Sequence, residues 1–163
     1  MVYAIEPAPS PTSFHELFVR HYERVKALLE AVRSAGLVIL AFDESSGDLA
    51  GSICLEAREG RPRALIVGRH SEVDLPLPAR GELSLRHLAV VLTQGDAADE
   101  VRFSVLDLRT RGAFYDEAGR RLEAVTAEGP IFLSCGGYQL FFLPSQTQDC
   151  WPDDAEDGWL CIP

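Results

Sequence analysis

The sequence contains no asparagine, one methionine and one lysine, Lys26, and it is poor in positive charge. Acidic residues outnumber basic ones by 25 to 15, which gives a net charge of -10. Nucleic acids and anionic membranes bind clustered positive charge, so this balance argues against both as partners. No apolar run reaches the ~18 residues of a membrane-spanning helix, and the first residues lack the features of a secretory signal. We therefore expect a cytoplasmic protein.

Cysteine is also scarce, and the motifs of common enzymes are missing. The four cysteines have neither CxxC pairing nor metal-ligand spacing, so no metal site is predicted; they are Cys54, Cys135, Cys150 and Cys161. Cys54 and Cys135 fall in apolar runs, where small buried thiols are ordinary in a reducing compartment. The sequence has no nucleophile elbow, Walker loop or zinc-protease motif. We expect a binding protein with no cofactor and no enzymatic activity.

The clearest local pattern is an amphipathic helix near the N-terminus. Apolar and aromatic residues recur at helical spacing over about five turns. Ser13 or Thr12 can cap its start, with a glutamate three residues after Ser13, and Gly36 can end it. The pattern predicts one helix over residues 13–35, preceded by a flexible, proline-containing lead over residues 1–12. Such an apolar stripe must pack against the rest of the chain or against a partner.

After this helix the pattern changes to short β-type runs separated by turn residues. They cover residues 37–42, 52–57, 63–68, 73–77, 88–92, 101–108, 113–116, 120–125, 131–135 and 138–143. About ten short strands at near-regular spacing predict an all-β sandwich or barrel, and 163 residues fit one domain. Residues 145–163 are polar and acidic apart from two tryptophans, and they are predicted to be a tail.

Three short motifs follow one another along these strands. Gly68-Arg69 ends one strand, Ser84-Leu85-Arg86-His87 precedes another, and Asp107-Leu108-Arg109-Thr110-Arg111-Gly112 ends a third. This order resembles that of the forkhead-associated (FHA) family, whose pattern is Gly-Arg, Ser-x-x-His and Asp-Leu-x-Ser-x-Asn-Gly. The resemblance covers residues 37–144. It implies an FHA-like β-sandwich that binds phosphothreonine peptides through loops at one end.

The resemblance also implies roles for individual residues. Arg69 would be the main phosphate ligand, and Ser84 would donate a hydroxyl hydrogen bond. Arg86, Thr110 and Arg111 would complete the phosphopeptide-binding surface from neighbouring loops. A phosphate carries nearly two negative charges and three acceptor oxygens, which suits guanidinium and hydroxyl donors. The structural support of this site would come from Gly68, His87 and Gly112.

The sequence departs from the family pattern at the Asn-Gly turn. Thr110-Arg111-Gly112 reads as one residue short, and the chain has no asparagine to replace the one that in the family reads the peptide backbone. Two functions therefore remain. The first is a phosphothreonine-dependent adaptor in signalling or protein assembly. The second is a degenerate FHA-like scaffold subunit that binds its partner independently of phosphorylation.

The acidic tail leaves two hypotheses open. In the first, it is a solvated tail whose tryptophans cover an exposed sheet edge. In the second, it is a docking segment. Its carboxylates would mimic a phosphate and occupy the region near Arg69 and Arg86, in the same or a neighbouring molecule. Tethering raises the effective concentration of such a segment, so that several weak contacts together would give autoinhibition or self-association. Self-association through the N-terminal helix is also left open.

Overall fold

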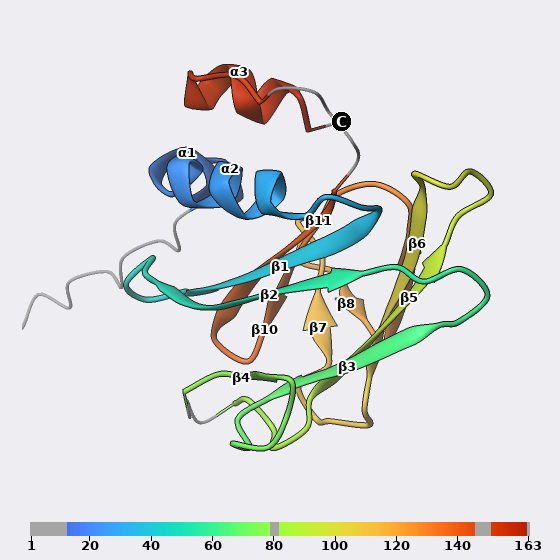
Figure 1. The fold of residues 1–163 in the computed structure, drawn as a ribbon. Coiled ribbons are helices and arrows are strands. Elements are labelled where there is room, and N and C mark those ends of the chain that lie inside the picture. Colours follow the sequence, from blue (N-terminus) through green and yellow to red (C-terminus); the bar gives the residue numbers. More distant parts are fainter. Residues whose placement is uncertain (1–12, 79–81, 146–150, 163) are drawn as a thin grey trace, which may run out of the picture.

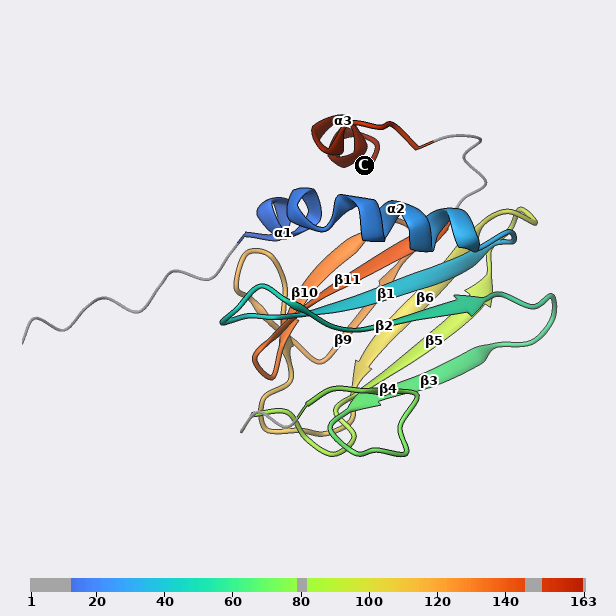
Figure 2. The ribbon, with the colours of Figure 1, turned by 60° about the vertical axis from the view of Figure 1, so that its left-hand side comes forward.

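The computed structural model describes residues 13–78, 82–145 and 151–162, so the predicted lead over residues 1–12 lies outside it. Two β-sheets pack face to face, and helices cover the outer face of one of them (Figure 1 and Figure 2). The first sheet has the strand order β2-β1-β11-β10-β7-β8, and the second has the order β4-β3-β5-β6-β9. The prediction of an all-β sandwich is confirmed. No helix of the described residues is long and apolar enough to cross a membrane.

The ten predicted runs correspond to eleven strands. They are β1 Gly36–Asp43, β2 Leu49–Glu56, β3 Arg63–Gly68, β4 Leu75–Pro76, β5 Leu88–Gln94, β6 Val101–Asp107, β7 Phe114–Tyr115, β8 Arg121–Leu122, β9 Ala124–Ala127, β10 Ile131–Cys135 and β11 Tyr138–Ser145. The run at 120–125 is divided, because β8 pairs with β7 in the first sheet and β9 pairs with β6 in the second. Strands β3 and β4 are parallel, whereas the other described pairs are antiparallel.

Strand β1 is buried over its whole length because both of its faces are covered. Its alternate residues belong to two apolar clusters: Leu37, Ile39 and Ala41 lie between the sheets, and Val38, Leu40 and Phe42 lie under the helices. Strand β6 instead alternates between buried and more exposed residues, since its outer face is not covered by a helix. The unbroken apolar sequence of β1 thus reflects the helical layer above it.

The predicted N-terminal helix is present as two consecutive helices. Helix α1 (Phe14–Arg20) begins at Ser13, whose side chain accepts a hydrogen bond from the backbone N–H of Glu16, as expected for its cap. Helix α2 (Tyr22–Ala31) follows after His21, which leaves the helical conformation at ψ 16°. No proline or glycine marks this break, so the hydrophobic period alone did not predict it.

The end of the helix was also predicted too late. Gly36 does not cap the helix, which ends at Ala31, but opens strand β1. At this position a Cβ atom would lie 2.6 Å from the carbonyl oxygen of Leu55 on the neighbouring strand. Gly36 is therefore required for a close approach between strands.

The acidic tail is not wholly an extended segment, because it contains helix α3 (Ala155–Leu160), which packs on α1 and α2. The ring of Trp159 lies 5.2 Å from that of Phe18, between centroids. Lys26 bonds Asp153 at 2.9 Å, and His15 bonds Glu156 at 2.7 Å. The tail hypothesis is wrong for contacts within one molecule, since these acids lie over the helices, far from the loop after β3 (Figure 1).

Candidate functional site

Three loops meet where strands β3 and β6 end and β5 begins (Figure 2). The backbone N–H of Arg69, directly after β3, donates to the carbonyl of Ser84 at 3.1 Å, and His70 donates to Leu85 at 3.2 Å. A Cβ atom on Gly68 would lie 2.2 Å from the oxygen of Leu85. The predicted supporting residue Gly68 therefore lets two of the loops run against each other.

A single buried imidazole, that of His87, joins the second loop to the third. Its Nδ1 accepts a hydrogen bond from the backbone N–H of Ser84 at 3.1 Å, so the ring proton of the neutral form is on Nε2. Nε2 then donates to the carbonyl of Ala113, 2.8 Å away. The side chain is 0% exposed. The structure thus gives His87 the geometry expected of a supporting residue.

The turn after β6 is held by its own side chains. The hydroxyl of Thr110 donates to Asp107 and accepts from the backbone N–H of Ala113 at 3.0 Å, and the N–H of Thr110 bonds the second oxygen of Asp107. Its oxygen also lies 3.0 Å from Nε2 of His87. Because the only proton of this hydroxyl is directed at Asp107, these bonds favour a supporting role for Thr110 over the predicted contact with a ligand.

The turn is not shortened, contrary to the expectation from the sequence. Arg109 and Ala113 have φ of 59° and 49°, in the left-handed region that glycine adopts readily. The pattern Asp-Leu-x-Ser-x-Asn-Gly therefore fits residues 107–113 without a gap. Gly112 stands at the place of the asparagine, and Ala113 takes the left-handed place of the glycine.

A polar pocket of about 670 Å³ lies against this turn. It is lined by Glu82, Ser84, Arg109, Thr110, Arg111, Gly112, Tyr115 and Gly136. Of the predicted residues, the structure brings Ser84, Thr110, Arg111 and Gly112 together here. Arg69 and Arg86 are outside this lining, although the backbone of Arg69 bonds that of Ser84.

Sequence reasoning gave no role in the site to four lining residues, which are Glu82, Arg109, Tyr115 and Gly136. Tyr115 is 40% exposed, which is unusual for so large a ring, and it lies only four residues after Arg111. The sequence signal that could have identified Tyr115 is an aromatic residue in a short β-type run between turn residues. Within the described ranges, no three histidine, cysteine, aspartate or glutamate side chains are grouped as metal ligands.

The arginines of the three loops are exposed and available to a ligand. Among the described residues, no ion pair involves Arg69, Arg86, Arg109 or Arg111. The Ser84 side chain likewise makes no hydrogen bond within the described part of the chain. The polar pocket combines the two guanidinium groups of Arg109 and Arg111 with one carboxylate, that of Glu82. Its net charge is therefore positive in a protein with a net charge of -10, which favours an anionic ligand there.

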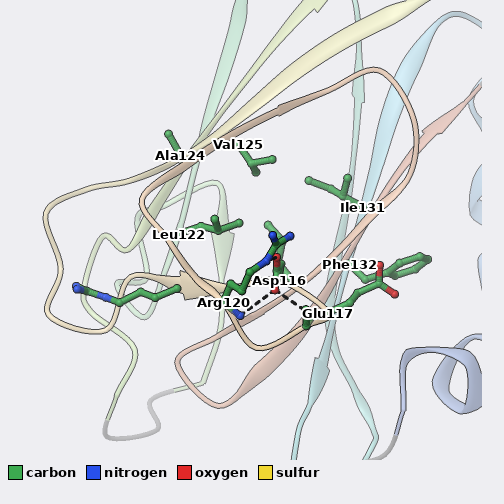
Figure 3. Close-up of a pocket in the computed structure, with 11 residues that line it drawn as sticks. Asp116, Glu117, Arg120, Leu122, Ala124, Val125, Ile131 and Phe132 are labelled. Carbon is green, nitrogen blue, oxygen red and sulfur yellow. Dashed lines mark hydrogen bonds and ion pairs between the residues drawn. The ribbon is translucent and has the colours of Figure 1, made fainter.

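A second pocket of about 660 Å³ lies between the edges of the two sheets (Figure 3). Apolar side chains of β8, β9 and β10 form much of its wall, including Leu122, Val125 and Ile131. At one side Arg120 bonds Asp116 at 2.7 Å. This pocket contains none of the predicted site residues.

Solved structures with a similar arrangement are FHA domains. The FHA domain of CT664 from Chlamydia trachomatis aligns with a TM-score of 0.50 and 16% identity, over 66% of this chain and 96% of that one. The FHA domain of yeast Dun1, in complex with a doubly phosphorylated peptide, aligns with a TM-score of 0.55 and 15% identity, over 74% of this chain and 82% of that one. The chain has an FHA-like fold.

Full-length yeast Pml1p also aligns with this FHA-like chain, with a TM-score of 0.52 and 15% identity, over 87% of this chain and 99% of that one. No family model matches the sequence, and no curated protein matches it. At these identities the similarity establishes the fold of the FHA-like domain, and its function must be argued from its own loops.

Proposed function

We propose that this FHA-like domain binds a protein segment carrying a phosphorylated threonine, and that it serves as an adaptor in signalling or protein assembly. The observation that carries the proposal is the polar pocket in which Ser84, Arg109 and Arg111 come together. We propose further that the protein is located in the reducing cytoplasm. The free thiols of Cys54, Cys135 and Cys161 are consistent with this location.

The chemistry of the pocket suits a phosphate. A guanidinium offers paired N–H donors and a permanent positive charge to phosphate oxygens. The Ser84 hydroxyl, with no partner in the described chain, supplies a short neutral donor. In the proposed complex Arg111 contacts the phosphate from the turn after β6, and Arg69 approaches it from the loop that bonds Ser84. Arg86 adds charge, while Thr110 and His87 hold the loops.

A specific observation also favours the second function, docking without phosphate. Gly112 replaces the asparagine of the family pattern, and the chain has no other asparagine. The same end of the sandwich exposes two large apolar side chains, Leu85 at 49% and Tyr115 at 40%. Such surfaces contribute to protein–protein contacts that do not depend on a phosphate.

An array of phosphorylated and unphosphorylated peptides, followed by calorimetry on the best binder, separates the two functions. Each charge-assisted hydrogen bond contributes ~1.5–3 kcal/mol, so Arg69→Ala should weaken phosphopeptide binding at least ~10-fold. Arg58→Ala is the matched control, because Arg58 is exposed in the turn between β2 and β3.

Unchanged affinity in Arg69→Ala would remove Arg69 from the site. Equal binding of phosphorylated and unphosphorylated peptides would exclude phosphate recognition and leave the second function.

A further inference from the structure

A hollow of about 440 Å³ lies next to the polar pocket, because Tyr115 lines both. The turn between β10 and β11 also connects the two linings. Gly136 lines the polar pocket, and the carbonyl of Gly137 accepts a hydrogen bond at 3.0 Å from the backbone of Glu44, which lines the hollow. A ligand held at the first pocket therefore lies close enough to reach the second.

The hollow has the opposite charge to the polar pocket. Two carboxylates that line it, those of Glu44 and Glu117, have no ion-pair partner among the described residues. Glu117 extends away from the paired side chains of Asp116 and Arg120 (Figure 3). The one basic side chain in the lining is that of His15, which already bonds Glu156 at 2.7 Å.

Three aromatic rings form another part of the wall. Tyr115 belongs to the sandwich, whereas Phe14 comes from α1 and Trp159 from α3. The ring of Trp159 is held against the ring of His15, with 5.1 Å between their centroids. Aromatic faces attract cations, and nearby carboxylates accept charge-assisted hydrogen bonds from them. Carboxylates beside aromatic rings form the environment of a site for an arginine or lysine side chain.

We propose that this hollow, the acidic subsite, receives a basic side chain from the same segment whose phosphate occupies the polar pocket. The inference rests on the proposed function and deepens it, because it defines the ligand by two opposite charges held a few residues apart. Arg109 and Arg111 select the phosphate, and Glu44, Glu117 and Tyr115 select the arginine or lysine. Since α1 and α3 supply part of the wall, the helical layer takes part in this selectivity.

The test uses peptides built on the best phosphothreonine binder. A single arginine is placed in turn at each position within about six residues of the phosphothreonine, a reach of ~20 Å in an extended chain, and each peptide is compared with its alanine counterpart by calorimetry. At one or two neighbouring positions the arginine should tighten binding to the intact protein about 5-fold, as expected for an exposed ion pair assisted by an aromatic ring.

The variants locate the effect. In the double variant Glu44→Gln with Glu117→Gln, the preference for arginine should fall below about 2-fold, because the carboxylates are removed at nearly constant size. The control Glu59→Gln, an exposed acid between β2 and β3, should keep the full preference. Arg111→Ala should instead weaken the arginine and alanine peptides by the same factor.

The outcomes separate the inference from the function on which it rests. Tight phosphopeptide binding with no gain from arginine at any position, or a gain that survives the double variant, would overturn the acidic subsite alone. Binding that ignores the phosphate would overturn both. A preference that diminishes with rising salt and with the double variant supports the subsite, because exposed ion pairs are screened.

Discussion

Replacing His87 offers the most direct test of how the three loops after β3, before β5 and after β6 are held. In His87→Ala, the backbone N–H of Ser84 and the carbonyl of Ala113 lose their partners, and each unpaired buried group costs ~1–3 kcal/mol. The lost ring also leaves a cavity in a site that is 0% exposed. We expect the free energy of unfolding to fall by ~3–5 kcal/mol, out of a total of ~5–15 kcal/mol for a domain of this kind.

Two conservative variants divide this loss between the two hydrogen bonds. The amide oxygen of asparagine reaches the place of Nδ1, so His87→Asn can keep the bond from Ser84. The amide nitrogen of glutamine reaches the place of Nε2, so His87→Gln can keep the bond to Ala113. Urea unfolding followed by tryptophan fluorescence should show each variant to be more stable than His87→Ala by about 1 kcal/mol.

A matched histidine in the first loop provides the control. His70 is only half-buried, and its Nδ1 accepts one hydrogen bond, from the backbone of Glu72 at 3.1 Å. His70→Ala should therefore change stability by no more than ~0.5 kcal/mol. If His87→Ala were within ~1 kcal/mol of the unmodified protein, or if neither amide variant exceeded alanine, the imidazole would not be what joins the loops.

Two further predictions concern the turn after β6 and the thiols. Gly112→Asn should tighten phosphopeptide binding ~2- to 10-fold in calorimetry, through one added hydrogen bond. The turn can accept this side chain, because a Cβ atom there meets nothing nearer than 3.4 Å. Gly129→Asn, in an open turn, should have no effect, and equal affinities for the two variants would refute the assignment of the turn. Burial raises the pKa of the Cys135 thiol to about 12. At pH 8 this thiol should therefore stay unmodified by a thiol reagent, while the exposed Cys54 reacts. Equal labelling of the two cysteines in the native protein, measured by mass spectrometry, would contradict the burial of Cys135.

The sandwich was predictable because strand patterns are local and each strand carries its own turn signals. The helical layer left a visible trace as well, in the unbroken apolar run of β1, which is covered on both faces. The sequence did not show which strands lie at the edges of the sheets. Cys54 looked like a buried residue in its apolar run, yet it is exposed on β2, an edge strand of the first sheet.

The structure brings only some of the predicted site residues together in one pocket. Ser84, Thr110 and Arg111 line one pocket, as motif order implied, because their loops are fixed by the strands that carry them. The sequence could not predict which of these side chains hold the loops and which are free for a ligand, since only the structure shows that the hydroxyl of Thr110 donates to Asp107. The tail was predicted to be polar because it carries five acids and no base. A few large contacts, such as that of Trp159 with Phe18, decide its packing instead.

The hydrogen bonds of His87 fix the shape of the loops when the chain folds, before any ligand binds, because one buried imidazole bonds both the Ser84 loop and the Ala113 turn. Conformational entropy that flexible loops would lose when a ligand arrives is instead lost once, when the chain folds. Selection for stability alone would then maintain the shape of these loops. A chain with glycine in place of the turn asparagine can therefore retain a preorganised surface that is open to a new partner.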